Sequence, residues 1–517
     1  MEQGLNIYSL IREQAGLYPE KTLIAVEEEA VTYGAFVTEV DRIGAALTAF
    51  GVKPGQMVGL ILPNSVWWYK IFWAAVRIGA QPVPLDPQVG EWEMVRLLSL
   101  TEAVICFAGI EYRGHRILDR LLTCRVDLPQ LKTVIAPGPL HEQPGLFSWE
   151  SFLQSVEGSL QDGAGEIMPG SDTLMLACTS GSTGNPKIIV VPQRGFYQSQ
   201  ADMGAYLEFK AWDVMLLGMP LYHQGGFGMG LQMILKGGTV FYQPLFDPRK
   251  FLTCVAKERV TIIQLTATLA KIILSVPDFN SYDLSSVRIC YFAGEVLPED
   301  LAREFYETLG IRVINIIGSS ETATMVVWDS KYDRAAECND FRPLPFTAMR
   351  ILDGEEQEVA PGEIGTLYIK TDALLTEYYQ NELENTFRLR KFEGQTWFNT
   401  GDLGEKLPDG RMRFRGRAKR IVKRGANLIY PEEIEAFLLT HPEIEAVAVV
   451  GAAHDLMGEM TVAYVQGKKD CLLNRGAIAK FCRDRLAAYK IPDQVVVCDE
   501  IPHDIGKIQF KYLNKEK

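Results

Sequence analysis

Closely spaced cysteines, an excess of basic charge and a membrane-length apolar run are all missing from this sequence of 517 residues. Its nine cysteines are spread singly, without any C-x-x-C spacing. This argues against a disulfide framework or a zinc site and favours a reducing, cytoplasmic compartment. The formal net charge of −13 argues against nucleic acid or an anionic membrane as the main partner. Residues 1–4 lack the basic and then apolar order that opens a signal peptide.

The most apolar segment covers residues 66–76, is rich in aromatic side chains and contains Lys70. It is too short to cross a bilayer. We therefore expect a helix buried in the core and no membrane span, with a membrane-contacting helix as the alternative. A length of 517 residues predicts two or more domains.

Short apolar runs alternate with longer amphipathic segments over much of the first 400 residues. Residues 58–62, 260–265 and 312–317 read as buried strands, and the first two precede helical patterns. This alternation predicts an α/β fold with layered, largely parallel sheets. Ligands bind such sheets at the loops beyond the strand ends.

Residues 411–424 carry eight basic side chains and no acidic one. By itself this run reads as a solvated strand or a nucleic-acid patch. A helix start at Pro431 and a compact αβ pattern follow it. We expect a large N-terminal domain over 1–416, a hinge over 417–420 and a small, mobile α+β domain over 421–517.

Residues 178–187 combine hydroxyl side chains, glycines and a lysine, a composition suited to a polyphosphate. Glycine lets backbone N–H groups approach phosphate oxygens, hydroxyls add donors, and lysine adds positive charge. The segment lies between two predicted strands and lacks the spacing of a P-loop NTPase. An ordinary hairpin turn is the alternative. The candidate phosphate-binding residues are Thr179, Ser180, Gly181, Ser182, Thr183, Gly184 and Lys187.

This segment resembles the Thr-Ser-Gly-Thr-Thr-Gly-x-Pro-Lys-Gly signature of the adenylate-forming enzymes, which include acyl- and aryl-CoA synthetases, adenylation domains and luciferases. Three further segments resemble motifs of that family in the same order. Residues 317–322 resemble Tyr-Gly-x-Thr-Glu, residues 397–402 match Trp-x-x-Thr-Gly-Asp, and residues 501–508 resemble Leu-Pro-x-Thr-x-Ser-Gly-Lys-Ile. The resemblance covers essentially the whole chain.

The resemblance implies a site for ATP and Mg²⁺ in the large domain. Glu321 would be the metal ligand and Ser320 a donor to the α-phosphate, unless Glu321 merely caps a following helix. Asp402 would accept from the ribose hydroxyls, with a simple turn as the alternative, and Arg417 would contact ribose or phosphate. The remaining nucleotide residues implied are Ala293, Gly294, Glu295, Asn315, Ile317 and Gly318, with Ile317 standing where a tyrosine is usual.

In the small domain, Lys507 would bridge the acyl carboxylate and the α-phosphate as the catalytic lysine, with a surface turn as the alternative. Lys419 would be the hinge about which this domain rotates. Lys423, Arg424 and Gly425 would line a tunnel for the thiol of coenzyme A, although Ala426 replaces a glycine there.

His223 would lie at the mouth of the acyl pocket, unless it is an ordinary core histidine. The other acyl-pocket residues expected are Gly226, Phe227, Gly294, Ser319 and Thr324. Residues 219–228 contain no acid that would pair with an ammonium group, which disfavours an amino-acid substrate. A compact aromatic or a short-to-medium aliphatic acid fits best.

The sequence therefore predicts a carboxylic acid–CoA ligase that uses ATP, Mg²⁺ and coenzyme A and proceeds through an acyl-AMP. One alternative is an adenylation enzyme that loads a phosphopantetheine carrier protein. Another is a catalytically inactive nucleotide-binding protein, which the intact motif residues disfavour. A homodimer and a carrier protein are further partners to consider.

Overall fold

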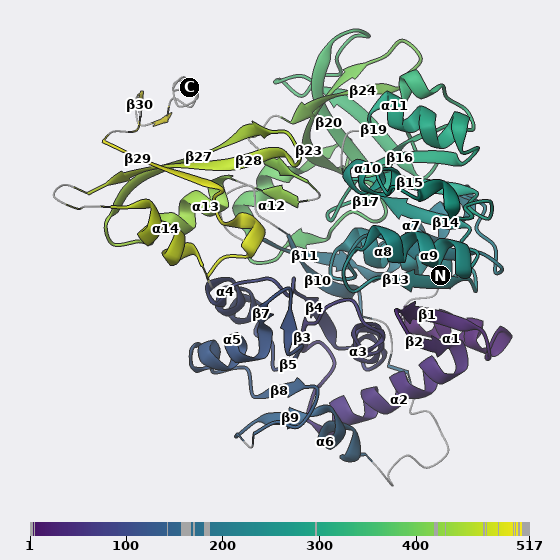
Figure 1. The fold of residues 1–517 in the computed structure, drawn as a ribbon, viewed down its shortest axis with the longest axis vertical. Coiled ribbons are helices and arrows are strands. Elements are labelled where there is room, and N and C mark those ends of the chain that lie inside the picture. The colour runs from purple at the N-terminus through teal and green to yellow at the C-terminus, as the bar shows by residue number, and fades with distance from the viewer. Residues whose placement is uncertain are drawn as a thin grey trace.

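The computed structural model contains a large mixed α/β domain and a small α+β domain at the C-terminal end (Figure 1). It describes residues 4, 6–141, 143–156, 167–168, 171–179, 187–294, 297–417, 422–425, 427–429, 431–468, 471, 473–483, 485–499, 501, 503–504 and 507–508. The predicted fold class is confirmed.

The main sheet has a parallel half, in the order β16-β15-β14-β12-β13-β1, with β2 antiparallel at its edge. These strands are β1(Thr22–Val26), β2(Glu29–Thr32), β12(Val214–Leu217), β13(Thr239–Tyr242), β14(Ile262–Leu265), β15(Ile289–Ala293) and β16(Arg312–Ser319). Helices that precede or connect them are α1(Ile7–Leu17), α2(Tyr33–Ala49), α7(Gln193–Tyr206), α8(Gln224–Ile234), α9(Pro248–Lys257), α10(Ala267–Leu274) and α11(Glu299–Arg303).

Beyond β16 the same sheet continues with antiparallel strands, which the sequence analysis did not predict. A turn of a few residues joins β16 to the next strand, and so short a connection permits only antiparallel pairing. The strands are β17(Ala323–Asp329), β18(Asp340–Pro343), β19(Thr347–Leu352), β20(Ile364–Thr371), β22(Leu389–Phe392), β23(Gln395–Lys406) and β24(Met412–Arg417). The sheet is therefore mixed.

A second, parallel sheet has the order β4-β3-β5-β8-β9. Its strands are β3(Met57–Ile61), β4(Gln81–Pro84), β5(Ile105–Ala108), β8(Thr133–Ala136) and β9(Leu146–Ser148). Its helices are α3(Val66–Arg77), α4(Glu91–Thr101), α5(Ile117–Cys124) and α6(Trp149–Gln154), with a small hairpin of β6(Glu111–Tyr112) and β7(His115–Arg116).

The aromatic segment forms α3, as predicted, and lies in the core. Ser65 caps it by accepting from the Trp68 amide. Apolar side chains occur all round this helix, so it is buried on nearly every side. Lys70 pairs with Glu39 of α2, which explains a charge in that position. In the described ranges, no helix combines the length and apolar character needed to cross a membrane.

The predicted phosphate segment connects two antiparallel strands, β10(Thr173–Thr179) and β11(Lys187–Pro192). β21(Glu377–Tyr378), which is followed by α12(Glu382–Arg388), pairs with β11. The strands therefore bring Tyr378 beside the end of the phosphate segment.

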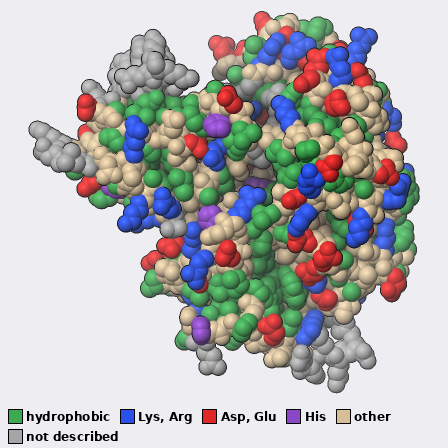
Figure 2. All heavy atoms as spheres, in the orientation of Figure 1, with side chains coloured by type: hydrophobic (Ala, Val, Ile, Leu, Met, Phe, Trp, Pro, Cys, Tyr) green, Lys and Arg blue, Asp and Glu red, His purple; other side chains and the backbone are tan. Residues whose placement is uncertain are grey.

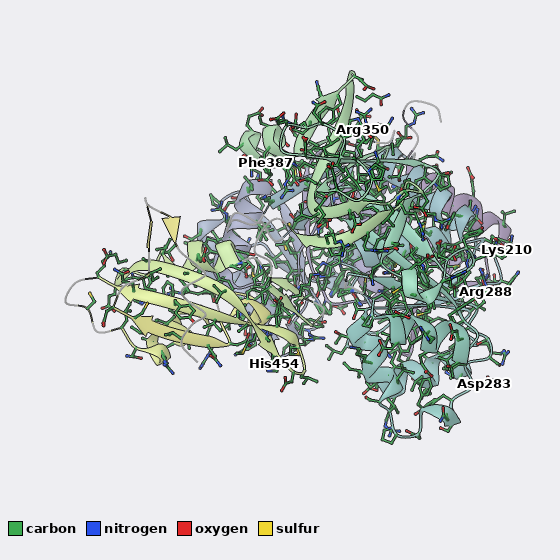
Figure 3. The ribbon with its side chains drawn as sticks, turned by 90° about the horizontal axis from the view of Figure 1, so that it is seen from above. Lys210, Asp283, Arg288, Arg350, Phe387 and His454 are labelled. Carbon is green, nitrogen blue, oxygen red and sulfur yellow. The ribbon has the colours of Figure 1, made fainter. Side chains whose placement is uncertain are left out.

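The small domain follows the main sheet directly: β24 ends at Arg417 and β25 begins at Val422. Its sheet has the order β26-β25-β28-β27, with β29 paired to β28. The elements are β25(Val422–Arg424), β26(Asn427–Ile429), α13(Pro431–Leu438), β27(Ile444–His454), β28(Gly458–Gly467), α14(Arg475–Cys482), η5(Ala488–Lys490) and β29(Gln494–Cys498). In Figure 3 this sheet lies on one side of the large domain, and His454 is at the end of the sheet that is nearer to the large domain.

On the face shown in Figure 2, lysine and arginine side chains are interspersed with aspartate and glutamate. Part of the basic run at 411–424 is neutralised in the same way. Arg413 binds Asp340 with both Nε and Nη2 at 2.7 Å, and Arg415 pairs with Glu405. These pairs support the reading of this run as a strand rather than a nucleic-acid patch.

Candidate active site

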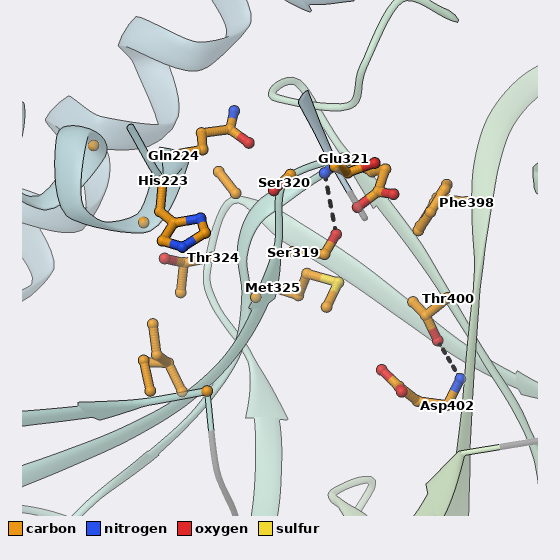
Figure 4. A pocket seen from close by; sticks show the side chains of 18 of the residues that line it. His223, Gln224, Ser319, Ser320, Glu321, Thr324, Met325, Phe398, Thr400 and Asp402 are labelled. Carbon is orange, nitrogen blue, oxygen red and sulfur yellow. Dashed lines mark hydrogen bonds between the residues drawn. The ribbon is translucent and has the colours of Figure 1, made fainter. Parts of the chain in front are cut away.

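A cavity of about 430 Å³ lies at the ends of β15 and β16, between the large domain and the small one. Many of the residues predicted for the site line it: Thr179, Lys187, His223, Ala293, Gly294, Gly318, Ser319, Ser320, Glu321, Thr324 and Asp402. In Figure 4, His223 and Gln224 lie on one side, Thr400 and Asp402 lie on the other, and Ser320 and Glu321 lie between them. The structure thus brings together segments that are far apart in the chain.

Glu321 lies in the tight turn between β16 and β17. No helix follows it, so the alternative reading of Glu321 as a helix cap is wrong. The turn is held by Ser319 Oγ, which accepts from the Glu321 amide at 3.2 Å. The Tyr378 hydroxyl donates to Glu321 Oε1 at 3.0 Å. Burial, and then the charge of Glu321, raise the pKa of Tyr378, so this phenol stays a neutral donor.

The carboxylate of Glu321 is a suitable hard ligand for Mg²⁺. Among the described residues, no group of three or more His, Cys, Asp or Glu side chains is arranged to hold a metal ion. Mg²⁺ is commonly held by one or two carboxylates together with substrate phosphates and water. The residues present therefore fit a metal ion that arrives with a polyphosphate.

Asp402 lies on β23, and its side chain lines the opposite side of the cavity although the residue is only 2% exposed. Thr400 Oγ1 accepts from the Asp402 amide at 3.0 Å and donates to the Leu367 carbonyl at 2.9 Å. Gly401 between them has φ +74°, a conformation that favours glycine. This local structure turns the carboxylate toward the cavity. Arg417 is its register partner on β24.

Lys187 has a partner that the sequence analysis missed. Its ammonium group lies 2.5 Å from Glu384 Oε1, and both side chains are buried. Arg388 also donates to that oxygen at 3.1 Å. Burial lowers the pKa of Lys187, whereas the pKa of Glu384 is lowered by the hydrogen bond from Lys187 in spite of its own burial. The phosphate segment thus ends, at Lys187, in a compensated charge cluster.

His223 is the N-cap residue of α8 and opens into the cavity. His223 is exposed to the open cavity. Desolvation by the surrounding protein lowers its pKa, and the charge of Asp86 acts in the opposite direction. The lowered pKa favours the neutral imidazole, which donates one hydrogen bond and accepts another without adding charge.

Several predicted residues lie elsewhere. Phe227 packs in an aromatic cluster with α3, its ring centroid 4.4 Å from that of Phe72. A Cβ on Gly226 would lie 2.2 Å from the Pro220 carbonyl oxygen, so this glycine serves close packing. Asn315 donates to the Cys338 carbonyl, and Ile317 packs against the core cluster under the antiparallel strands. These four are not among the residues that line the cavity.

From the small domain, Asn427 and Tyr489 line the cavity. The neighbouring predicted residues have structural contacts. Arg424 donates to Asp493 at 2.6 Å, the Lys423 amide donates to Glu459, and Gly425 has φ +58°. The backbone of Lys507 lies in β31(Lys507–Ile508), which pairs with β30(His503–Asp504) at the outer end of this domain (Figure 1).

Seven predicted residues lie outside the described part of the chain: Ser180, Gly181, Ser182, Thr183, Gly184, Glu295 and Lys419. The same holds for the side chains of Arg417 and Lys507. The sequence analysis in turn missed several cavity residues, namely Phe196, Gln200, Gln224, Met229, Gln232, Met325, Tyr378, Glu384, Arg388, Asn427 and Tyr489. The eight-residue spacing of Gln224 and Gln232, which places both on one helix face, was a signal for two of them.

Comparisons with known proteins agree with this geometry. Residues 11–379 match the family "AMP-binding enzyme" and residues 433–505 match "AMP-binding enzyme C-terminal domain". The chain is 29% identical over 508 residues to an indoleacetate–CoA ligase of Aromatoleum aromaticum, covering 96% of both chains.

Two solved structures show the same fold. The amide bond synthetase McbA of Marinactinospora thermotolerans matches with a TM-score of 0.84 and 21% identity, covering 98% of this chain and 99% of that one. An o-succinylbenzoate CoA synthetase of Bacillus subtilis, bound to a product analogue, matches with a TM-score of 0.83 and 22% identity over 98% of both. The family matches establish that the chain belongs to the AMP-binding enzymes, and with the indoleacetate–CoA ligase they place it in the family of adenylate-forming acyl- and aryl-CoA synthetases.

Proposed function

We propose that this protein joins a carboxylic acid to the thiol of coenzyme A at the expense of ATP, in two half-reactions. First, a carboxylate oxygen bonds to the α-phosphorus of ATP and pyrophosphate leaves. The thiol sulfur then bonds to the acyl carbon, and AMP leaves as the thiol proton is lost. The observation that carries this proposal is a single cavity in which Glu321 and Asp402 lie across from His223, with the apolar side chains of Phe196, Met229 and Met325 also in its lining.

Each side of the cavity has its own role. Asp402 accepts from the ribose hydroxyls, because a carboxylate has lone pairs for two donors at once. Glu321 would hold Mg²⁺, which would neutralise charge on the phosphates. His223, whose pKa is lowered by desolvation, marks where the acyl carboxylate meets the nucleotide. Fixed charges and donors of this kind commonly contribute about 10²–10³-fold each to the rate.

The orientation of the small domain fits the second half-reaction. Asn427 and Tyr489 border the cavity, whereas the strand that carries Lys507 lies at the outer end of the domain. We infer that the small domain rotates about Lys419 to bring Lys507 to the α-phosphate for the first half-reaction. Such hinge motions place different residues at one site in turn.

The location, the acceptor and the oligomeric state complete the proposal. The nine cysteines are all free thiols, which supports a cytoplasmic location. A carrier protein is the alternative acceptor, because its phosphopantetheine arm presents the same thiol as coenzyme A. Light scattering in solution would test for a homodimer.

Two assays test the function. With a suitable acid, the enzyme should release pyrophosphate, and adding free coenzyme A should give a thioester. Pyrophosphate release without any CoA thioester would favour the carrier-protein alternative. Absence of both with a broad panel of acids would contradict the proposed function.

Asp402→Ala should raise the KM for ATP by about an order of magnitude or more, since a buried acceptor of two hydroxyls is lost. Asp409→Ala, in the exposed turn after β23, is the matched control. An unchanged KM for ATP in Asp402→Ala would remove the ribose assignment.

A further inference from the structure

The acyl side of the cavity contains a polar stripe made of three glutamines. Gln224 and Gln232 lie on α8 with Gly228 midway between them, so the three positions share one helix face. Gln200 reaches this face from α7. A Cβ on Gly228 would lie 3.1 Å from Gln200 Oε1 and 3.2 Å from Phe196 Cζ. The missing side chain of Gly228 therefore makes room for Gln200.

The amides of this stripe are buried but incompletely paired. Gln200, Gln224 and Gln232 are 3%, 7% and 1% exposed. Gln232 Nε2 donates to Gln200 Oε1 at 2.8 Å. Within the described residues, Gln232 Oε1 and both amide atoms of Gln224 have no hydrogen-bond partner. Buried polar groups are normally satisfied, so such a cluster beside a cavity calls for a partner that the protein does not supply.

The hydrogen bond between Gln232 and Gln200 uses the nitrogen of Gln232 and the oxygen of Gln200, so the oxygen of Gln232 and the nitrogen of Gln200 stay outside it. Oxygen and nitrogen of a glutamine amide are assigned from their contacts. If both amides were flipped, one oxygen and one nitrogen would again lie outside the hydrogen bond between them. The hydroxyl groups of Tyr291 and Thr324 lie next to Gln232 and to each other. All these groups are neutral.

The rest of this side is apolar, with Phe196, Met229, Ile316 and Met325 among the lining residues. Among the charged residues that line the cavity, Glu384 pairs with Lys187 and Arg388, and Glu321 and Asp402 lie across from His223 (Figure 4). A second charged group on the substrate would therefore be buried without a counter-ion, which is strongly unfavourable.

We propose that the acid carries one neutral hydrogen-bonding group remote from its carboxylate, a hydroxyl or a ring N–H, and that Gln200 and Gln232 bind it. This inference rests on the proposed function and narrows its substrate class. A hydroxyl can donate to an amide oxygen and accept from an amide N–H, and a ring N–H can donate to the unpaired oxygen of Gln232. Plain alkyl or aryl acids leave the amides unpaired, and dicarboxylates place a second charge against them.

Matched acids test the proposal. The panel pairs 4-hydroxyphenylacetate with 4-methylphenylacetate, 4-hydroxybenzoate with 4-methylbenzoate, and 6-hydroxyhexanoate with heptanoate, and adds indole-3-acetate and 4-carboxyphenylacetate. The readout is kcat/KM for pyrophosphate release. A site built to bind a hydroxyl or N–H rejects an analogue without it by up to about 10⁴–10⁵-fold. We expect a preference of at least about 10²-fold for the hydroxyl member of the pair that fits, or for indole-3-acetate over the methyl acids, and negligible activity with 4-carboxyphenylacetate.

Substitutions identify the residues responsible. Gln232→Leu and Gln200→Leu should each reduce this preference at least about tenfold, by lowering kcat/KM for the polar acid and raising it for the methyl acid. Gln264→Leu is the matched control, because Gln264 is equally buried and unpaired but lies on β14, outside the cavity lining. Melting temperatures show which variants fold. If only one of Gln200→Leu and Gln232→Leu folds, that variant alone is enough to test the proposal.

The outcomes separate the two proposals. Two results would overturn this inference alone. One is turnover of acids with no preference for the polar members. The other is a preference that Gln264→Leu changes as much as Gln232→Leu does. Failure of every acid to release pyrophosphate would instead contradict the proposed function.

Discussion

Lys490 of the small domain donates to Glu93 Oε1 of the large domain at 2.7 Å, across 397 positions of the chain. Lys490 also donates to Glu433 Oε1 at 2.6 Å, and all three side chains are buried. The other oxygen of Glu93 accepts from the amides of Gly90 and Ala487, at 3.0 and 2.9 Å. One carboxylate at the start of α4 therefore fixes the orientation of the small domain.

The backbones approach closely at the same contact. A Cβ on Gly90 would lie 2.0 Å from the carbonyl carbon and oxygen of Arg485, so only glycine fits there in this orientation. The aromatic rings of Trp92 and Phe437 meet beside it with centroids 5.6 Å apart. Rotation of the small domain has to break this whole contact.

Glu93→Gln should weaken the observed orientation more than it weakens folding. Removing one partner of a buried ion pair commonly costs about 3–5 kcal/mol, and domain separation relieves that cost. We expect thioester formation from synthetic acyl-AMP to fall at least about tenfold, with adenylate formation and melting temperature little changed. Glu102→Gln, at the exposed end of the same helix, is the control. Equal loss of both half-reactions with a lower melting temperature would mean that Glu93 serves folding alone.

Glu433 should make stability depend on pH. Burial raises the pKa of Glu433 to about 7. The positive charge of Lys490 lowers this pKa, and the negative charge of Glu93 raises it. Tyr489 beside them stays neutral because burial raises its pKa. The folded protein therefore binds a proton that the unfolded chain releases at its ordinary, lower pKa. The stability from this proton is complete at acidic pH and is lost as pH rises through about 7.

Glu433→Gln mimics the protonated carboxyl and provides the comparison. Melting curves from pH 5 to pH 8 should show the unsubstituted protein losing melting temperature relative to Glu433→Gln as pH rises. A difference between the two proteins that stays constant over this range would refute the assignment.

Glu384→Gln should expose the dependence of Lys187 on its counter-charge. The variant leaves a buried ammonium group without its carboxylate partner, and we expect a clear loss of melting temperature. Because the sequence analysis makes Lys187 a candidate ligand of the ATP phosphates, saturating ATP should recover much of that loss. Glu382→Gln, an exposed position in the same helix, should behave like the unsubstituted protein. If ATP did not restore the melting temperature of Glu384→Gln, the assignment of Lys187 to phosphate binding would be contradicted.

Lys507→Ala should affect only the first half-reaction. Its strand lies at the outer end of the small domain in this orientation, so a role in adenylation requires rotation. Adenylate formation should fall by about 10²–10³-fold, while thioester formation from synthetic acyl-AMP persists. Lys480→Ala, exposed on α14, is the control. An equal fall in both half-reactions would contradict the two-orientation scheme.

Local patterns in the sequence determined much of the fold. The apolar run after Ser65 predicts α3, because apolar side chains on every side of a helix have to be buried. Residues 312–317 predict β16 and the polar turn after it, which holds Glu321. These features depend on residues that are neighbours in the chain. Asp402 and Glu321 could be identified from the sequence for the same reason, because each lies in a short motif of neighbouring residues.

Only the tertiary structure decided what surrounds those positions. Phe227 follows His223 by four residues, yet α8 turns it toward α3 and turns Gln224 and Gln232 toward the cavity. Glu384 reaches Lys187, and Glu93 reaches Lys490, only because distant elements pack together. Hydrophobic periodicity specifies which face of an element is buried, but not which element covers it. A buried charge or amide finds its partner across that contact, and the packing of whole elements therefore determines the pairing.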